Sequence, residues 1–184
     1  MSENPTRPTA KFISFPGTIH LIKSDLELAK IELGSIREIG FDTETRPSFK
    51  KGEVYNVALL QLATDTDAYL IRLHFITQFQ LIKNILENPE ITKAGVAIRD
   101  DLKILQKTFS FVPQGFVELQ DLAKKKGLQN FGLKGMTEEV LNAPLTKGPK
   151  LTNWEASTLT PEQQMYAATD AWVGLAIYRK LVRG

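Results

Sequence analysis

Short apolar runs of strand length alternate with helical segments along most of this 184-residue sequence. Strands are expected where such runs are bounded by turn residues, at 18–22, around Asp42, and at 54–63, 68–73 and 91–98. The polar segment between the third and fourth runs has the turn chemistry of a hairpin. This alternation favours an α/β three-layer domain around a mixed sheet over a sandwich or a bundle.

Capping boxes are expected to begin three helices, at Ser24 with Glu27, Thr77 with Gln80, and Thr160 with Gln163. The first helix is expected to end near Gly34 and the second before Pro89. Pro161, at the first helical position, makes the last helix the clearest element of the sequence. Shorter helices are expected at 118–126 and 133–142.

The composition is that of one globular domain, predicted at residues 17–184 after a flexible lead-in at 1–16 that packs partly through Phe12 and Phe15. The sequence has no cysteine, so any metal must be bound by oxygen or imidazole. No run approaches the roughly 20 apolar residues that span a bilayer. We therefore expect no membrane insertion and a cytoplasmic location. The net charge of +2 does not by itself require a nucleic-acid partner.

Two carboxylates follow an apolar strand near the first third of the sequence. Asp42 and Glu44 alternate with Phe41 and Thr43, so they point to one face of the extended segment. Carboxylates are costly to bury without a partner, and a divalent cation is the simplest one. The alternative is a strand end that turns into a solvated loop at 46–48.

Two later segments carry carboxylates in comparable settings. Asp101 follows the junction between an expected strand and a helix, and Asp170 lies in an apolar stretch of the last helix. Tyr166 shares a helical face with Asp170, and Gly174 on that face allows close approach to the sheet. The alternative is that the Tyr166 hydroxyl is simply hydrogen-bonded within the fold and that Asp170 pairs with a nearby arginine or lysine.

Four carboxylates from three segments repel one another unless cations neutralise them. Two divalent ions are the economical solution, and oxygen ligands suit Mg²⁺ or Mn²⁺. A pair of such ions, about 3.5–4 Å apart, clamps the attacking and leaving oxygens of phosphoryl transfer. The acidic set Asp42, Glu44, Asp101 and Asp170 therefore predicts a two-metal site.

Three stretches of the sequence resemble, in order, the three exonuclease motifs of the DEDDy family: 41–45, 95–102 and 166–171. The sequence is similar in particular to the exonuclease domain of the Werner syndrome protein and the catalytic domain of ribonuclease D. The likeness extends over residues 18–182 or so and includes Leu151-Thr152-Asn153-Trp154. It implies a ribonuclease H-like fold and metal-dependent removal of nucleoside 5′-monophosphates from the 3′ end of DNA or RNA.

The resemblance also implies roles for individual residues. Asp42, Glu44 and Asp170 would hold the tighter ion, Asp42 would also touch the second, and Asp101 would hold the second directly or through water. Tyr166 would position the attacking water and help to deprotonate it, although its ordinary pKa near 10 suits orientation better than full general-base action. Met165 stands where the sister subfamily has a histidine.

The neighbouring polar residues have simpler expected roles. Asp100 is expected to be solvated or capping, and His20 and His74 structural or on the surface. Candidate substrate contacts are Lys124–Lys126, Lys147, Lys150, Asn153, Trp154, Phe49, Tyr55 and Gln61. The alternatives are a solvated face for the lysine run and a core anchor for Trp154.

Two other functions are compatible with the same fold. One is a non-catalytic nucleic-acid-binding module, and the other is an endonuclease of the ribonuclease H type. The intact acidic set argues against the first, and Tyr166 argues against the second.

Overall fold

The computed structural model describes residues 11–146, 148 and 152–184, which form a mixed sheet flanked by helices. The six strands, in the order β1-β4-β3-β2-β5-β6 across the sheet, are β1 (Thr18–Ile22), β2 (Glu38–Thr45), β3 (Val57–Ala63), β4 (Asp67–Arg72), β5 (Thr92–Gly95) and β6 (Phe116–Glu118). The helices are α1 (Asp25–Leu28), the 3₁₀ turn η1 (Leu73–Phe75), α2 (Gln80–Leu86), α3 (Ile98–Leu105), α4 (Leu119–Lys125), α5 (Leu133–Leu141) and α6 (Pro161–Arg183).

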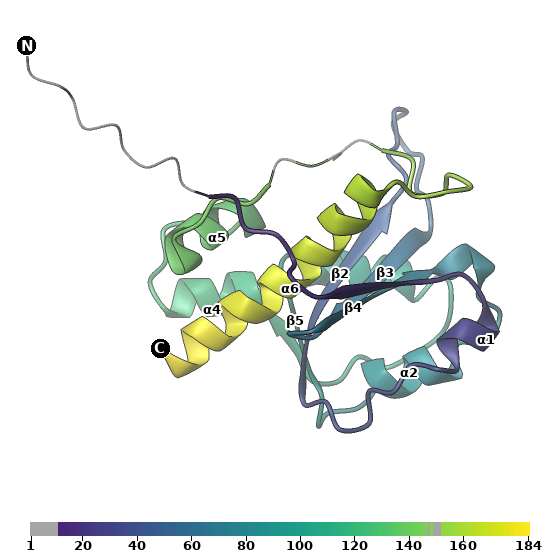
Figure 1. Ribbon diagram of the computed structural model, residues 1–184, viewed down its shortest axis with the longest axis horizontal. Helices are drawn as coiled ribbons and strands as arrows, with labels where there is room; N and C mark the ends of the chain where they lie inside the picture. The colour runs from purple at the N-terminus through teal and green to yellow at the C-terminus, as the bar shows by residue number, and fades with distance from the viewer. Residues whose placement is uncertain (1–10, 147, 149–151) are drawn as a thin grey trace, which may run out of the picture.

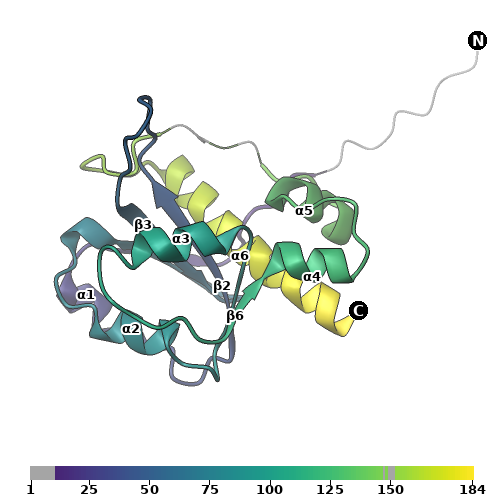
Figure 2. The same cartoon turned by 180° about the vertical axis from the view of Figure 1, so that it is seen from behind.

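The helices form layers on both faces of the sheet, as the sequence predicts. The long helix α6 crosses one face (Figure 1), whereas α1, α2 and α3 lie over the other (Figure 2). β3 pairs antiparallel with β2 and β4, and the remaining neighbours pair in parallel. None of the helices in the described part of the chain combines the length and the apolar character that crossing a membrane requires.

The central strand β2 sends its side chains alternately into two different environments. Ile39 and Phe41 are buried in the core cluster that includes residues of α1, α2 and α3. Asp42 and Glu44 point to the opposite face, where α6 lies. Because a one-residue slip would exchange the two sets, burial of Ile39 and Phe41 fixes the direction of the carboxylates.

The helix α6 packs on this sheet through small residues. Ala167, Ala168 and Ala171 are fully buried in a cluster with residues of β3 and β4. At Gly40 the helix backbone comes so close that a Cβ would lie 1.8 Å from the carbonyl oxygen of Ala171. At Gly174 a Cβ would lie 3.3 Å from a carbonyl oxygen of β5, which confirms the predicted close approach.

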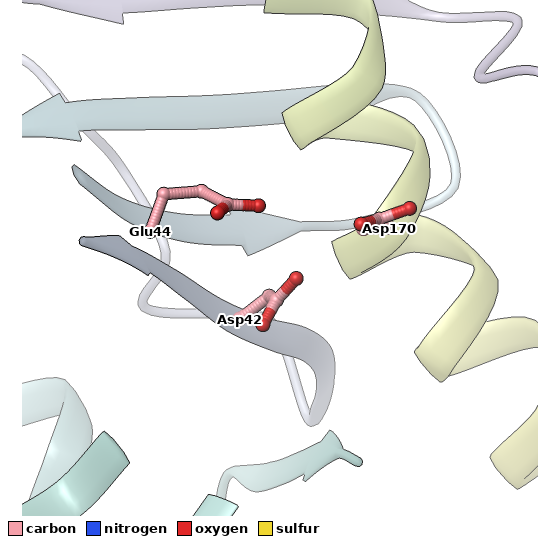
Figure 3. A group of neighbouring side chains, drawn as sticks. All are labelled: Asp42, Glu44 and Asp170. Atoms are coloured by element: carbon pink, nitrogen blue, oxygen red, sulfur yellow. The ribbon is translucent and has the colours of Figure 1, made fainter. Parts of the chain in front are cut away.

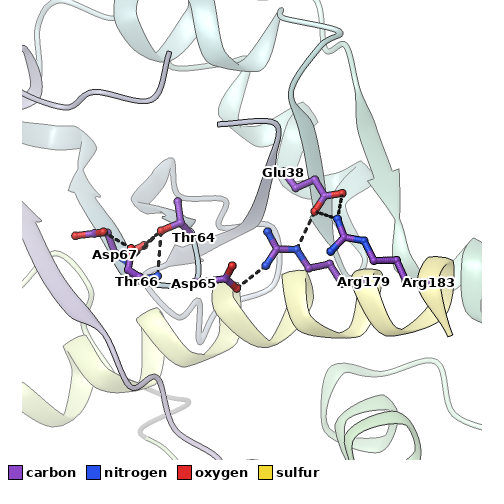
Figure 4. A network of polar contacts seen from close by, with 7 residues as sticks. All are labelled: Glu38, Thr64, Asp65, Thr66, Asp67, Arg179 and Arg183. Carbon is purple, nitrogen blue, oxygen red and sulfur yellow. Dashed lines mark hydrogen bonds and ion pairs between the residues drawn. The ribbon is translucent and has the colours of Figure 1, made fainter. Parts of the chain in front are cut away.

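A polar network holds the C-terminal half of α6 against the start of β2 (Figure 4). The Arg179 guanidinium donates to Glu38 at 2.8 Å and also to Asp65 in the β3–β4 turn. Arg183 donates to the same Glu38 carboxylate at 2.9 Å. The Thr64 hydroxyl accepts the Asp67 N–H at 3.0 Å and closes the predicted hairpin turn.

Residues 11–16, the described part of the predicted lead-in, contribute to the core. Phe15 is only 2% exposed and packs edge-on against Trp172 of α6, with ring centroids 5.9 Å apart. Its N–H donates to the Thr169 hydroxyl at 3.0 Å. Phe12 is exposed, so the predicted packing is confirmed for one of the two phenylalanines.

The two N-terminal helix predictions were wrong in their details. Ser24 caps α1 as predicted, but the helix ends at Leu28 rather than near Gly34. Thr77 does not cap α2, because it bonds to Asp25 instead. Its N–H donates to the Asp25 carboxylate at 2.9 Å, and its hydroxyl donates to the other oxygen of the same carboxylate. The last helix agrees with its prediction in both capping box and first residue.

The expected strand at 91–98 is also shorter, because β5 ends at Gly95 and α3 begins at Ile98. β3 begins at Val57 rather than at Val54. The short strand β6, which has no long apolar run, escaped the sequence reasoning.

Gly40→Ala should destabilise the protein by about 1–3 kcal/mol, because the added Cβ must push α6 away from β2. The matched control is Gly34→Ala, where nothing lies within 4 Å of the added Cβ. That control should stay within about 1 kcal/mol of the wild type. Urea unfolding of both variants measures the difference, and equal midpoints would contradict the proposed tightness of the contact between α6 and β2.

Candidate active site

Three carboxylates from β2 and α6 meet where these two elements cross. Single oxygen atoms of Asp42, Glu44 and Asp170 all lie within 4.8 Å of one another. Figure 3 shows the two side chains of β2 facing the one from α6. Asp170 is 8% exposed, and the other two are half-buried. This geometry, with oxygen ligands only, fits a divalent cation.

The electrostatics of the group favour a bound cation. The pKa of Asp42 is raised well above its ordinary value, first by burial and then by the charges of Glu44, Asp170 and Asp101. The pKa of Glu44 is raised to about 8, first by burial and then by the charges of Asp170 and Asp101. One stabilising contact is the Thr43 N–H, which donates to Asp42 at 2.9 Å. Without a cation the group therefore retains protons near neutral pH.

Asp101 lies beside the three-carboxylate group, in the first turn of α3. Its charge raises the pKa values of Asp42 and Glu44. Within the described residues, the oxygens that lie within 4.8 Å of one another belong to Asp42, Glu44 and Asp170 and do not include one from Asp101. Burial raises the pKa of Asp101 to about 6, and a hydrogen bond from the Thr43 side chain opposes the shift. Asp100 is exposed in the same turn, as predicted for a solvated residue. The structure therefore brings all four predicted acids to one region.

Tyr166 lies one turn before Asp170 and forms a side-chain hydrogen bond with it. Its pKa is raised, first by burial and then by the charges of Asp170 and Glu44, so the phenol is protonated at neutral pH. The ring stacks on Trp154 with centroids 6.2 Å apart. Gly148 lies against the ring, where a Cβ would come within 1.7 Å of Cδ2.

Two of the predicted substrate contacts have buried side chains in this structure. Trp154 is 1% exposed and belongs to the core cluster under α6, which supports the alternative of a core anchor. Gln61 is fully buried, and its side-chain amide lies 3.4 Å from the carbonyl oxygen of Ala167. Both side chains support the elements that carry the carboxylates.

The other predicted substrate contacts that the structure describes are exposed or partly exposed. Asn153 is exposed, and its side chain accepts the Glu155 N–H at 3.0 Å to shape a turn. Lys147 and Lys150 lie outside the described residues. The remaining side chains are Phe49, Tyr55 and Lys124–Lys126, of which Phe49 and the lysines are exposed and Tyr55 is partly exposed.

The two histidines make contacts of the structural kind that the sequence predicts. His20 pairs with Asp67 at 2.7 Å and stacks on Tyr69 with ring centroids 4.9 Å apart. His74 packs against Phe75, with ring centroids 4.3 Å apart.

A buried arginine that the sequence reasoning missed holds the loop in front of α6. Arg72 is fully buried at the end of β4, and its guanidinium donates to the Ser157 carbonyl at 3.0 Å. It also donates to the carbonyl oxygens of Trp154 and Ala156. In the sequence Arg72 only ends an apolar run, so no local signal reveals this contact with a loop more than 80 residues away.

The sequence of this chain matches a known protein family over most of its length. A family model described as 3′-5′ exonuclease matches residues 19–183. The chain belongs to the 3′–5′ exonuclease family. This places the carboxylate group in a family of hydrolytic nucleases, in agreement with the three motifs of the sequence.

Relatives of this exonuclease-family chain include animal and bacterial proteins. The mouse bifunctional 3′-5′ exonuclease/ATP-dependent helicase WRN is 36% identical over an alignment of 185 positions, which covers 92% of this chain and 13% of the mouse protein. Escherichia coli ribonuclease D is 35% identical over 147 residues, which cover 78% of this chain and 38% of the bacterial one. The chain therefore spans well under half of either protein.

Solved structures confirm the predicted ribonuclease H-like exonuclease fold. The crystal structure of E. coli ribonuclease D matches with a TM-score of 0.79 and 31% identity over 90% of this chain and 44% of that one. The EXO domain of Aedes aegypti Nibbler matches with a TM-score of 0.80 and 26% identity over 90% of this chain and 87% of that domain.

In chelator, the free energy of unfolding should fall as the pH rises from 5 to 8. The folded-state pKa values of Glu44 (about 8) and Asp101 (about 6) exceed their ordinary values of 4.5 and 3.8, so the folded state binds more protons in this range. That stabilisation is complete below the ordinary values and is lost as each folded-state pKa is passed. His74, whose pKa burial lowers, acts in the opposite sense.

The variant Glu44→Gln isolates the contribution of one carboxylate. Its stability should decline less than that of the wild type between pH 6 and pH 8, as measured by urea unfolding at each pH. Mn²⁺ should stabilise the wild type more at pH 8 than at pH 5.5, because the ion competes with protons. Identical pH profiles for variant and wild type would show that Glu44 is not buried against other charges.

Proposed function

We propose that this protein is a metal-dependent 3′–5′ exonuclease that removes nucleoside 5′-monophosphates from the 3′ end of DNA or RNA. The observation that carries the proposal is the group of Asp42, Glu44 and Asp170 within 4.8 Å in a chain of the 3′–5′ exonuclease family. A protein that only bound nucleic acid would gain nothing from a carboxylate group whose burial and mutual repulsion oppose folding.

Each carboxylate has a place in a site for two divalent cations, Mg²⁺ or Mn²⁺. Asp42, Glu44 and Asp170 would hold one ion, and Asp101 would hold the second together with Asp42. Two bound cations supply the positive charge that stabilises the attacking and leaving oxygens in phosphoryl transfer. The chain contributes a fixed ligand set on a strand and two helices, which keeps the geometry rigid.

Tyr166 has a positioning role beside Asp170. Its raised pKa keeps the hydroxyl protonated, so it acts by hydrogen bonding rather than as a strong base. The ring stacks on Trp154, and Gly148 also lies against it, so packing restricts where the hydroxyl points. We assign to this hydroxyl the orientation of the attacking water.

The substrate in this proposal is a nucleic acid with a free 3′ end. E. coli ribonuclease D is an exoribonuclease involved in structured RNA processing, which supports RNA among the candidate substrates. Asn153 is exposed in the loop before α6, and together with Lys150 it keeps its predicted role as a substrate contact.

Incubation of 5′-labelled DNA and RNA oligonucleotides with Mg²⁺ or Mn²⁺ should give a ladder of products shortened from the 3′ end, with release of mononucleotides. Chelator should abolish the ladder. Asp42→Asn should reduce the rate by at least about 100-fold, because it removes a charge shared by both proposed ions. The control is Asp100→Asn, which changes the exposed neighbour of Asp101 and should leave the rate within about threefold.

Internal cuts on circular substrates would instead indicate an endonuclease. Activity that persists in chelator or in Asp42→Asn would contradict the proposal outright. Absence of both cleavage and Mn²⁺ binding would favour the non-catalytic module.

Tyr166→Phe should slow turnover by about 10- to 100-fold, because the attacking water loses its orienting hydroxyl. Mn²⁺ affinity, measured by calorimetry, should stay close to that of the wild type because no carboxylate is removed. Loss of Mn²⁺ binding in this variant would show that the hydroxyl supports Asp170 as a ligand rather than orienting water.

A further inference from the structure

The turn between β5 and α3 has an unusual backbone conformation directly before Asp101. Ala97, the residue before the first turn of α3, has φ 56° and ψ 41° in the left-handed region. For a residue with a Cβ this conformation is less favourable than the right-handed one, because the Cβ lies too close to the following carbonyl oxygen. A conformation of this kind persists only where surrounding contacts hold it.

Glu118 supplies those contacts from another part of the chain. One oxygen of its carboxylate accepts the Ala97 N–H at 2.7 Å, and the other accepts the Ile98 N–H at 2.8 Å. These N–H groups stand at the start of α3, where no residue of the helix itself can accept them. Hydrogen bonds from N–H groups to a carboxylate are among the stronger ones, and the negative charge also suits a helix N-terminus.

The sheet places Glu118 at this turn. It ends β6, where it is the parallel partner of Gly95 at the end of β5. Its side chain also accepts the Gln120 N–H at 3.3 Å at the start of α4. The same carboxylate therefore joins the ends of two strands to the starts of two helices.

Asp101 depends on this turn for its direction. It follows Ile98 by three residues, so the conformation at 97–98 sets the orientation of the turn that carries its carboxylate. The Asp101 carboxylate itself forms a side-chain hydrogen bond with Thr43 of β2. A change in the conformation of this turn would move the Asp101 carboxylate relative to Asp42, which lies next to Thr43 on β2.

We propose that Glu118 is a positioning residue that holds the left-handed turn at Ala97 and thereby aims Asp101 at the carboxylates of β2. The inference rests on the proposed function, in which Asp101 holds the second cation. Glu118 touches neither substrate nor cation in this proposal. It acts through the backbone of residues 97–98.

The test is calorimetric titration of the metal-free protein with Mn²⁺ alone. Asp101→Asn first defines which part of the wild-type binding belongs to the second ion. Glu118→Ala should weaken that part by about 10- to 100-fold, which is the usual effect of removing a supporting contact behind a metal ligand. Glu118→Gln keeps one acceptor oxygen and should show a smaller loss.

A double variant separates the turn from a general loss of structure. Glycine adopts the left-handed region without a steric penalty, so Glu118→Ala with Ala97→Gly should recover much of the lost affinity for the second ion. The matched control is Asp121→Asn, which removes the ion pair between α4 and Arg99 of α3 but leaves the N–H groups of residues 97–98 bonded. It should bind Mn²⁺ like the wild type.

Hydrogen exchange of the metal-free protein gives a readout that is independent of cations. The amides of Ala97 and Ile98 should exchange faster in Glu118→Ala than in the wild type, whereas amides in the centre of α6 should be unchanged. This pattern distinguishes local release of the turn from a fall in global stability.

Wild-type affinity for the second ion in Glu118→Ala, or no recovery in the double variant, would overturn the inference. If Asp101→Asn leaves Mn²⁺ binding unchanged, the assignment of Asp101 in the proposed function fails, and the inference fails with it. If Asp101→Asn loses the second ion but Glu118→Ala does not, only the inference fails.

Discussion

The close contact between the backbones of α6 and β2 is the constraint on which the site depends. It exists because Gly40 leaves no side chain between the strand and the carbonyl oxygen of Ala171. Gly40 precedes Asp42 by two residues, and Ala171 directly follows Asp170, so the point of contact adjoins the carboxylates. A wider spacing of helix and sheet would separate Asp170 from the two acids of β2.

The acids oppose the contact that brings them together. Burial and mutual repulsion raise the pKa values of Asp42 and Glu44, so the folded protein stores unfavourable electrostatic energy at this junction. Other parts of α6 hold it in place, with Phe15 packed on one side and Arg179 bonded to Glu38 at the far end. Such a site is stabilised by a bound cation, which explains why a fold tolerates it.

Local rules predicted the parts of the structure that depend on neighbouring residues. The period of two in β2 set the shared face of Asp42 and Glu44, and the capping box at Thr160 set the start of α6. The four acids were predicted in part from their apolar surroundings and in part from the likeness of their motifs to a known family. Their approach within one region was therefore a prediction, and the strand order that brings it about came from the three-dimensional structure.

Contacts between distant segments were beyond the sequence reasoning. Asp25 accepts hydrogen bonds from Thr77, which therefore does not cap α2 as expected. Arg72 binds a loop more than 80 residues away, and Glu118 supports a turn 20 residues earlier. In each case a charged side chain binds backbone groups, which carry no sequence signal. The burial of Trp154 and Gln61 has the same cause, since neighbouring residues do not reveal what covers a side chain.

The most direct measurement of the central claim is anomalous scattering from crystals of the protein soaked in Mn²⁺. The account predicts one manganese peak among the carboxylates of Asp42, Glu44 and Asp170, and a second, weaker peak between Asp42 and Asp101. Manganese elsewhere on the protein, with these carboxylates in contact only with water or with one another, would contradict it.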